Sequence, residues 1–387
     1  MDDITVIFAD LHTAILGSIA KNVVDSLAAQ DELTPSAIKR IETAQTTGLL
    51  RDEIAAHVAT ALAVTTPEVI KLFNDAAVKS LAYDSEVYRA AGLDPIDIKQ
   101  SPTMLKILQA GISKQMGSIN RLTGTIAINS EELFERTLNT AYNKTVSGTH
   151  SQTEALNEGM DELAREGVTA FYYSSGRNIS IEAALLMNIR TGIAQTTGEL
   201  TRQGMIERQA SYVQVSAHKG ARNKGNGHKN HADWQGKFYY FREVAIEPNI
   251  HNLLDFVITC GLDLVDGILG ANCRHHYGPA FPGITHPRYT DEDLSEMNGV
   301  TYTETLPDGT TRIWSAYDAN QHLNRLALGL RNWKRRRDVK QAARDAGADV
   351  DIAFEKKKVK EWIQRIDDFT KSTGLRRQHF RERVAKL

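Results

Sequence analysis

The residues whose types could do chemistry are concentrated in one stretch of the chain, residues 215–282. Seven of the twelve histidines lie between His218 and His286, and both cysteines, Cys260 and Cys273, lie there too. Imidazole titrates near neutral pH and is a common metal ligand, as is thiolate. The sequence before this stretch, and most of the sequence after it, has the apolar spacing of long helices. A specific site is therefore expected within these residues.

A zinc site is one possibility that the stretch offers. Zinc takes four ligands, usually with a closely spaced pair at each end of a loop. Cys273 and His275 are close in sequence, and His231 is among the histidines that could converge on them. However, there is no Cys-x-x-Cys pair, and twelve residues separate Cys260 from Cys273. We therefore expect no metal cofactor, and keep zinc held by His231, Cys273 and His275 as the alternative.

Phosphodiester chemistry is a second possibility. It needs groups that move protons and fixed cations that stabilise the developing negative charge. The stretch supplies these groups in His218, Arg222, His231, Arg274 and His275. Because no order or spacing fixes their geometry, we expect no catalytic site and no enzyme. Cleavage or modification of nucleic acid by these five residues is the alternative function.

The C-terminal segment indicates a third kind of chemistry, contact with nucleic acid. Residues 320–387 carry nineteen Lys and Arg against nine Asp and Glu, whereas residues 1–70 carry ten acidic and four basic side chains. Clusters of cations are all that phosphate neutralisation requires, although charge runs are usually solvated helix faces. The residues predicted to contact DNA are Lys334, Arg335, Arg336, Arg337, Lys356, Lys357, Lys358, Arg376 and Arg377.

The elements that position these residues are mostly helices. Apolar periodicity and capping signals predict helices over 3–29, 35–47, 49–64, 67–91, 102–146, 152–166 and 180–210, with an extended loop at 170–177. The expected fold is mainly α, an elongated helical bundle with a small α+β unit inserted before C-terminal helices. We expect a helical region over 1–210 that docks on a partner, an α+β unit over 211–315, and a basic helical tail over 316–387.

The predicted α+β unit has short elements. Alternating apolar residues predict strands at 212–215 and 238–241, and a hairpin joins 300–303 to 310–314 through a Pro-Asp-Gly turn. Short helices are expected within 251–260 and over 290–297, and turns at Gly278-Pro279 and Pro282-Gly283. Three helices, over 318–346, 350–371 and 375–387, are expected to form the tail.

The chain shows no signal for a membrane. Its N-terminus is acidic, and no apolar run approaches the roughly 18 residues that a membrane helix needs. Two cysteines in 387 residues fit a reducing cytoplasm and exclude a disulfide scaffold. The overall net charge of −2 says little about partners.

Three ordered blocks carry a resemblance to a known family. They are residues 217–222 (AHKGAR), 231–237 (HADWQGK) and 272–275 (NCRH), the last followed by Phe-Pro-Gly at 281–283. They resemble the tailed-phage proteins called phage minor capsid protein 2, a family similar to the Mu F-like head morphogenesis proteins. The motif core maps onto Trp234, Gly236, Asn272 and Cys273. The sequence departs from the family pattern at Leu269, where a second cysteine is common, and in the added basic loop at 223–229.

The resemblance implies a structural protein of the virion. Its expected place is the capsid interior near the portal, after assembly in the host cytoplasm. Its expected partners are the portal protein, the major capsid protein and packaged double-stranded DNA. Its expected roles are head assembly, DNA packaging or DNA ejection. A protein that only binds nucleic acid is a further alternative.

Overall fold

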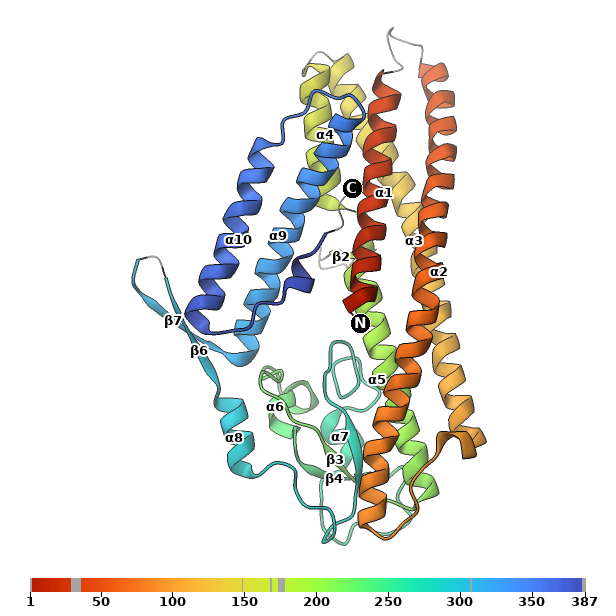
Figure 1. Ribbon diagram of the computed structural model, residues 1–387, viewed down its shortest axis with the longest axis vertical. Coiled ribbons are helices and arrows are strands. Elements are labelled where there is room, and N and C mark those ends of the chain that lie inside the picture. Colours follow the sequence, from red (N-terminus) through yellow and green to blue (C-terminus); the bar gives the residue numbers. More distant parts are fainter. Residues whose placement is uncertain are drawn as a thin grey trace.

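The computed structural model describes residues 2–28, 36–147, 149–167, 169–172, 178–306 and 308–384. The described chain is mainly α-helical, as predicted, and elongated (Figure 1). Long antiparallel helices run the length of the molecule, and the small sheet-containing unit lies beside one end of them.

Five helices form the bundle: α1 (Asp2–Ala28), α2 (Ser36–Ala90), α3 (Pro102–Val146), α4 (Gln152–Glu166) and α5 (Ile181–Glu207). The apolar stripe predicted for the first helix is buried in their shared core, including Phe8, Ile15 and Val23. The predicted helices over 102–146, 152–166 and 180–210 are confirmed. Each results from spacing that puts apolar residues on one helical face.

The helix α2 is continuous over 55 residues, about 80 Å at 1.5 Å per residue. The prediction of three helices over 35–47, 49–64 and 67–91 is therefore wrong, and residue 35 lies outside the described residues. Pro67 lies inside the helix, where a proline removes one backbone hydrogen bond. Val69 and Phe73 just after it are buried in the bundle core. Packing of the adjoining turns thus outweighs the local start signal at Thr66-Pro67.

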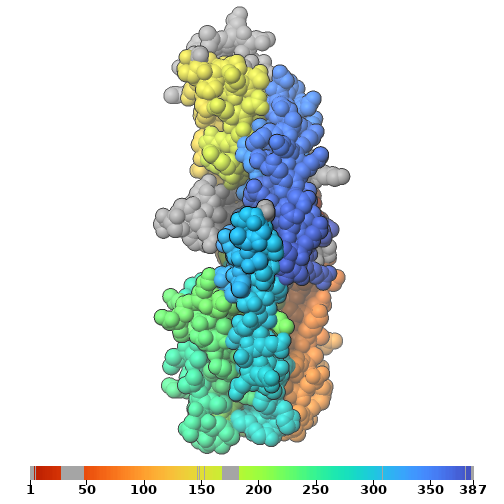
Figure 2. Space-filling model, turned by 90° about the vertical axis from the view of Figure 1, so that its left-hand side faces the viewer, coloured from red at the N-terminus to blue at the C-terminus, as the bar shows by residue number. Residues whose placement is uncertain are grey.

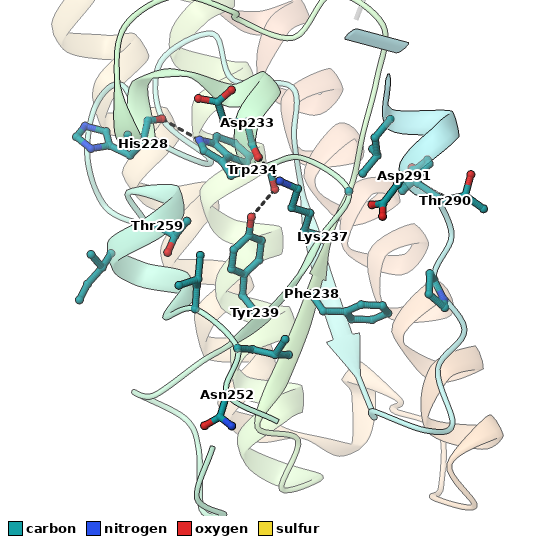
Figure 3. Close-up of a pocket in the computed structure, with 18 residues that line it drawn as sticks. His228, Asp233, Trp234, Lys237, Phe238, Tyr239, Asn252, Thr259, Thr290 and Asp291 are labelled. Carbon is teal, nitrogen blue, oxygen red and sulfur yellow. Dashed lines mark hydrogen bonds between the residues drawn. The ribbon is translucent and has the colours of Figure 1, made fainter. Parts of the chain in front are cut away.

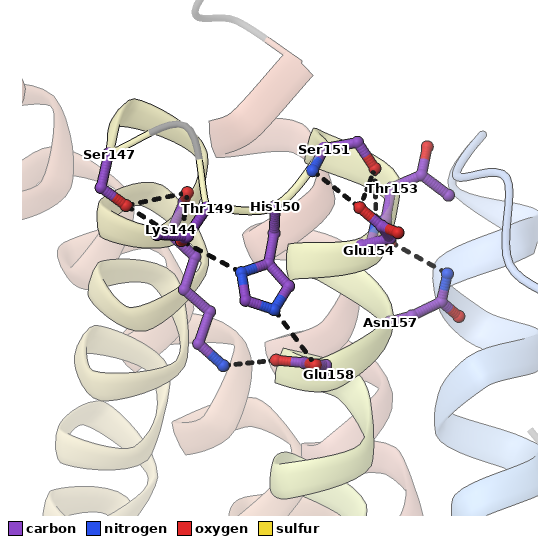
Figure 4. A network of polar contacts seen from close by, with 9 residues as sticks. All are labelled: Lys144, Ser147, Thr149, His150, Ser151, Thr153, Glu154, Asn157 and Glu158. Atoms are coloured by element: carbon purple, nitrogen blue, oxygen red, sulfur yellow. Dashed lines mark hydrogen bonds and ion pairs between the residues drawn. The ribbon is translucent and has the colours of Figure 1, made fainter.

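Local caps fix where α3 and α4 begin. The Ser101 side chain accepts a hydrogen bond from the backbone of Met104, and Pro102 occupies the first helical position. Ser151 and Glu154 form a reciprocal capping box at the start of α4 (Figure 4). In the same network Glu158 pairs with Lys144, which ties the end of α3 to α4.

The segment predicted as an extended loop over 170–177 lies partly in strands. β1 (Thr169–Tyr172) pairs antiparallel with β2 (Asn178–Ser180), so the prediction of an extended chain is confirmed for the first part. Residues 173–177 of that prediction lie outside the described residues. The strand pair connects α4 to α5.

A three-stranded sheet of order β4-β3-β5 is the centre of the α+β unit. β3 (Tyr212–Val215) and β4 (Phe238–Tyr240) were predicted, whereas β5 (Tyr277–Ala280) occupies the place of the turn expected at Gly278-Pro279. That expectation is wrong because, within the described sheet, β5 is an edge strand that pairs with β3, and an edge strand tolerates proline. The short helices η2 (Gly227–Lys229), α6 (His231–Trp234) and α7 (Phe256–Cys260) pack around the sheet.

The hairpin and the tail complete the fold. Thr290 caps α8 (Asp291–Gly299) as predicted, and β6 (Thr301–Thr305) pairs with β7 (Thr311–Ser315). The hairpin packs on the tail, where the Trp314 ring lies 6.1 Å from the Phe369 ring. The tail helices are α9 (Ala316–Asp345) and α10 (Ala353–Thr373). Figure 2 shows α10 above the hairpin on one face of the molecule.

The predicted third tail helix over 375–387 is wrong for the residues that the structure describes. After Gly374, whose φ is +70°, the chain turns back along α9 and forms only the short helix η3 (His379–Glu382). Arg377 pairs with both Asp367 and Glu382, which holds this segment against α10. These ion pairs favour a folded-back segment over a free helix.

One helix of the described chain is long and apolar enough to cross a membrane, contrary to the sequence prediction. It is Val6–Leu27 within α1, with a mean hydropathy of 1.2. In the structure 67% of this stretch is buried inside the protein. Its apolar face forms part of the bundle core with α2, α3 and α5.

Candidate metal centre and nucleic-acid surface

Strand pairing brings distant members of the histidine-rich stretch together. β3 and β5 pair so that Val215 is opposite Tyr277, and the Ser216 N–H donates to the His276 carbonyl. The residues just beyond these strand ends, His218 and His275, therefore lie side by side. Their rings stack with centroids 4.3 Å apart.

The three alternative zinc ligands do converge. The Nδ1 atom of His275 lies 3.6 Å from the Cys273 Sγ, and the Nδ1 atom of His231 lies 3.8 Å from the same sulfur. The donor atoms of all three side chains lie within 4.8 Å of one another. Cys260 is not part of this group. It is fully buried in the apolar core of the unit instead.

On each imidazole, the ring nitrogen that does not face the Cys273 sulfur lies within hydrogen-bond distance of an oxygen acceptor. His231 Nε2 lies 2.9 Å from the Asp266 carbonyl oxygen, so this nitrogen carries the proton. His275 Nε2 lies 3.1 Å from Gln235 Oε1, which also accepts the backbone N–H of His218 at 2.9 Å. Because that atom accepts a backbone donor, it is the amide oxygen, and His275 Nε2 is protonated as well.

Burial keeps this cluster neutral. It lowers the pKa of His231 to about 4 and the pKa of His275 to about 2, because a charged imidazolium would lose its hydration. Burial also raises the pKa of the Cys273 thiol. With their Nε2 atoms protonated, both neutral rings present a lone pair on Nδ1.

The two arginines of the phosphodiester hypothesis donate hydrogen bonds to backbone carbonyls. Arg222 donates to the Asp266 carbonyl at 3.1 Å, and Arg274 donates to the Gly220 carbonyl at 3.3 Å. The structure thus brings all five residues of that hypothesis into one region. It gives them contacts that stabilise loops, and the catalytic hypothesis stays untested.

The residues of the motif core pack around the histidine and cysteine cluster or shape the backbone beside it. Trp234 is buried and donates from Nε1 to the His228 carbonyl, and its ring lies 4.5 Å from that of His231. Gly236 has a φ of +77°, and a Cβ there would lie 2.4 Å from Leu294. Asn272 also has a positive φ, of +60°, at the turn before Cys273. Backbone geometry therefore accounts for the residue types at Gly236 and Asn272.

A groove of about 1040 Å³ opens beside the cluster (Figure 3). Trp234 and Tyr239 line it, and the Tyr239 hydroxyl donates to the Trp234 carbonyl. Leu254 and Ile258, also in its wall, are 66% and 73% exposed. Large apolar side chains exposed at a groove are typical of binding surfaces.

Six of the nine cations predicted to bind DNA are ion-paired, hydrogen-bonded or buried within the fold. Four of them pair with carboxylates: Arg336 with Asp161, Arg337 with Asp338, Lys358 with Glu361 and Arg377 with Glu382. Lys334 donates to the Glu382 carbonyl at 2.7 Å, and Arg335 is only 5% exposed. Of these six residues, Lys334 and Arg377 join segments of the tail to each other, and Arg336 joins the tail to α4.

The remaining three predicted cations, Lys356, Lys357 and Arg376, are exposed. Lys360 and Lys371 are exposed as well; they lie on α10 with Lys356 and Lys357, and Arg376 lies just beyond the end of that helix. Within the described part of the chain none of these five is in an ion pair. We call these five residues the α10 basic surface.

Sequence reasoning missed three residues that organise these sites. Gln235 lies inside one of the three motif blocks but gives no local sign that it orients His275. Asp266, whose carbonyl accepts from His231 and Arg222, lies in a loop without a motif. Asp161, about 180 residues before its partners Arg336 and Lys340, is on a helix with an ordinary pattern.

Comparison with known proteins identifies the class of protein to which this fold belongs. The family described as Phage minor capsid protein 2 matches residues 1–371. The chain belongs to this family and is a structural protein of a phage virion. No curated protein and no solved structure matches it. The relation to Mu F-like proteins stays a prediction.

Proposed function

We propose that this minor capsid protein lies inside the phage head at the portal and contacts packaged DNA during assembly, packaging or ejection. The observation that carries the proposal is the α10 basic surface. Its cations are exposed, whereas Arg336, Arg337 and Arg377 of the same tail pair with carboxylates. Cations that fold stability does not use are free to neutralise phosphates.

The groove beside Trp234 supports a second contact, with another virion protein. Its exposed wall residues Leu254 and Ile258 would bury apolar area on docking, which favours association by roughly 25 cal/mol per Å². We propose the portal protein as the occupant, and the major capsid protein as a neighbour. The sequence prediction that residues 1–210 make the portal contact is the competing location.

A paired-variant experiment separates the two locations. Leu254→Ser with Ile258→Ser changes the groove, whereas Val78→Ser with Ile128→Ser changes residues of the bundle that are each 60% exposed. Phage are produced with each variant, and the amount of this protein that crosslinks to the portal in purified heads is measured. We expect the groove pair to lose crosslinking and the bundle pair to keep it.

The opposite result would place the docking surface on the helical region. Equal crosslinking by both variants would exclude the groove as the portal contact. The interior position is tested on the same particles with protease. The protein should resist digestion in intact filled heads and become sensitive when the heads are opened, and digestion in intact heads would contradict the proposal.

A further inference from the structure

We propose that His231, Cys273 and His275 bind one Zn²⁺ ion, with the two imidazoles coordinating through Nδ1 and the cysteine through Sγ. The inference concerns the α+β unit and does not depend on portal or DNA contact. It rests on the placement of the donor atoms, on the groups that orient them, and on the number of protons available between them.

The donor spacing suits zinc. Bonds of about 2.3 Å to sulfur and about 2.0 Å to nitrogen at a tetrahedral angle separate the two ligand atoms by roughly 3.6 Å. The measured Sγ to Nδ1 distances are 3.6 Å for His275 and 3.8 Å for His231. The two sulfur-to-nitrogen separations therefore already fit a tetrahedral zinc ion.

Both imidazoles are oriented in the way that metal-bound histidines usually are. A ligating histidine commonly donates its other ring N–H to a carbonyl or carboxylate oxygen. His231 donates from Nε2 to the Asp266 carbonyl, and His275 donates from Nε2 to Gln235 Oε1. Gln235 is fixed in turn, because its Nε2 donates to Asn298, which donates to the Ala232 carbonyl.

Proton counting argues against a purely hydrogen-bonded cluster. Two Nδ1 lone pairs face the sulfur, and a thiol has a single proton to donate. Without a cation, one of two nearly fully buried imidazoles, 3% and 2% exposed, keeps an unsatisfied acceptor. An unsatisfied buried polar atom costs about 1–3 kcal/mol. A zinc ion satisfies both lone pairs at once.

A further nitrogen without a partner lies beside the group. The Nε2 atom of His218 is buried and has no hydrogen-bond partner among the described residues, and its ring stacks on that of His275. Three protein ligands leave a fourth zinc position, which a water can fill. Cys273 is partly exposed, so an ion can reach the site from solvent.

Binding is written as an exchange of one proton for the ion. The Cys273 thiol loses its proton to solvent, a Zn–S bond forms, and both imidazoles bind in their neutral form. The ion would link α6 to the segment that enters β5. This part of the unit has few regular hydrogen-bonded elements, so the expected role of the metal is structural.

The test is metal content of the full chain, purified without a polyhistidine tag and analysed by mass spectrometry. Cys273→Ala removes the central ligand, and Cys260→Ala is the matched control, because Cys260 lies outside the donor group. We expect near-stoichiometric zinc in the wild type and in the Cys260 variant, and its loss in the Cys273 variant. Zinc retained by the Cys273 variant would overturn the proposal.

A second measurement covers the case in which the Cys273 variant fails to fold. The wild-type chain, stripped with a chelator and reloaded with Co²⁺ alone, should show a thiolate-to-cobalt charge-transfer band with tetrahedral d–d absorption. Zn²⁺ should displace this spectrum and raise the Tm of the stripped protein. A stripped wild-type chain that binds neither ion under reducing conditions would also overturn the proposal.

Discussion

Lys340 on α9 and Glu355 on α10 form an ion pair at the contact between the two tail helices, with Nζ 3.0 Å from Oε1. Their side chains are only 8% and 1% exposed. The same Nζ lies 3.0 Å from Asp161 on α4, so one cation joins both tail helices to the bundle. The charge of the tail predicts DNA binding, but some of its charged residues also form ion pairs that join the tail to the bundle.

Breaking this pair should destabilise the protein strongly. Lys340→Met leaves Glu355 buried without a counter-charge, and the expected loss is about 3–5 kcal/mol of unfolding free energy. The matched control is Lys358→Met, which breaks the more exposed pair with Glu361 and should cost under about 1 kcal/mol. Chemical denaturation measures both, and equal losses would show that the Lys340 pair is not effectively buried.

Asp84 should make stability depend on pH. It is 1% exposed, and among the described residues only one of its carboxylate oxygens has a partner, the Thr201 hydroxyl at 2.7 Å. Burial raises the pKa of Asp84 to about 7. The folded state therefore holds this proton more tightly than the unfolded state. Its stabilising contribution is full below about pH 4 and is lost as the pH rises through about 7.

The substitution Asp84→Asn tests the predicted direction of this pH dependence. Relative to the wild type, the variant should be more stable at pH 8 than at pH 5 by roughly 3 kcal/mol, because the wild type loses about 1.4 kcal/mol per pH unit between pH 5 and the folded-state pKa of about 7. Asp75→Asn, an exposed change on the same helix, is the control and should show no pH-dependent difference. Thermal unfolding at both pH values measures the difference, and parallel pH profiles for wild type and Asp84→Asn would contradict the assignment.

Capping residues and apolar periodicity were enough to predict several of the helices from the sequence. Ser101, Ser151 and Thr290 cap α3, α4 and α8 where expected, because a cap is encoded within four residues. The same reasoning divided α2 at Pro67, since packing on the other helices is not visible in sequence. β5 was missed because its only partner, β3, is about 60 residues away.

The candidate site was only partly predictable for the same reason. The blocks that carry the family resemblance contain His231, Cys273 and His275, and the structure brings these three residues together. Their orientation depends on Gln235 and on the Asp266 carbonyl, which only tertiary contacts reveal. Likewise, charge counting found the basic tail but could not show that Asp161 would pair with Arg336.

The most direct test of the proposed function is the salt dependence of DNA binding by the full chain. Lys356→Gln, Lys357→Gln and Lys360→Gln together remove three cations of the α10 basic surface. The control removes three exposed lysines of the bundle, Lys71, Lys79 and Lys114, with the same change in net charge. The bundle helices α2 and α3 lie across the molecule from α10 (Figure 1).

Each phosphate contact contributes about 0.9 to the slope of log affinity against log salt concentration. We therefore expect the α10 variant to bind double-stranded DNA more weakly, with a slope smaller by roughly 2.7. The bundle variant should keep the wild-type slope. Equal slopes for the two variants would show that DNA contact does not occur through α10 and would contradict the account.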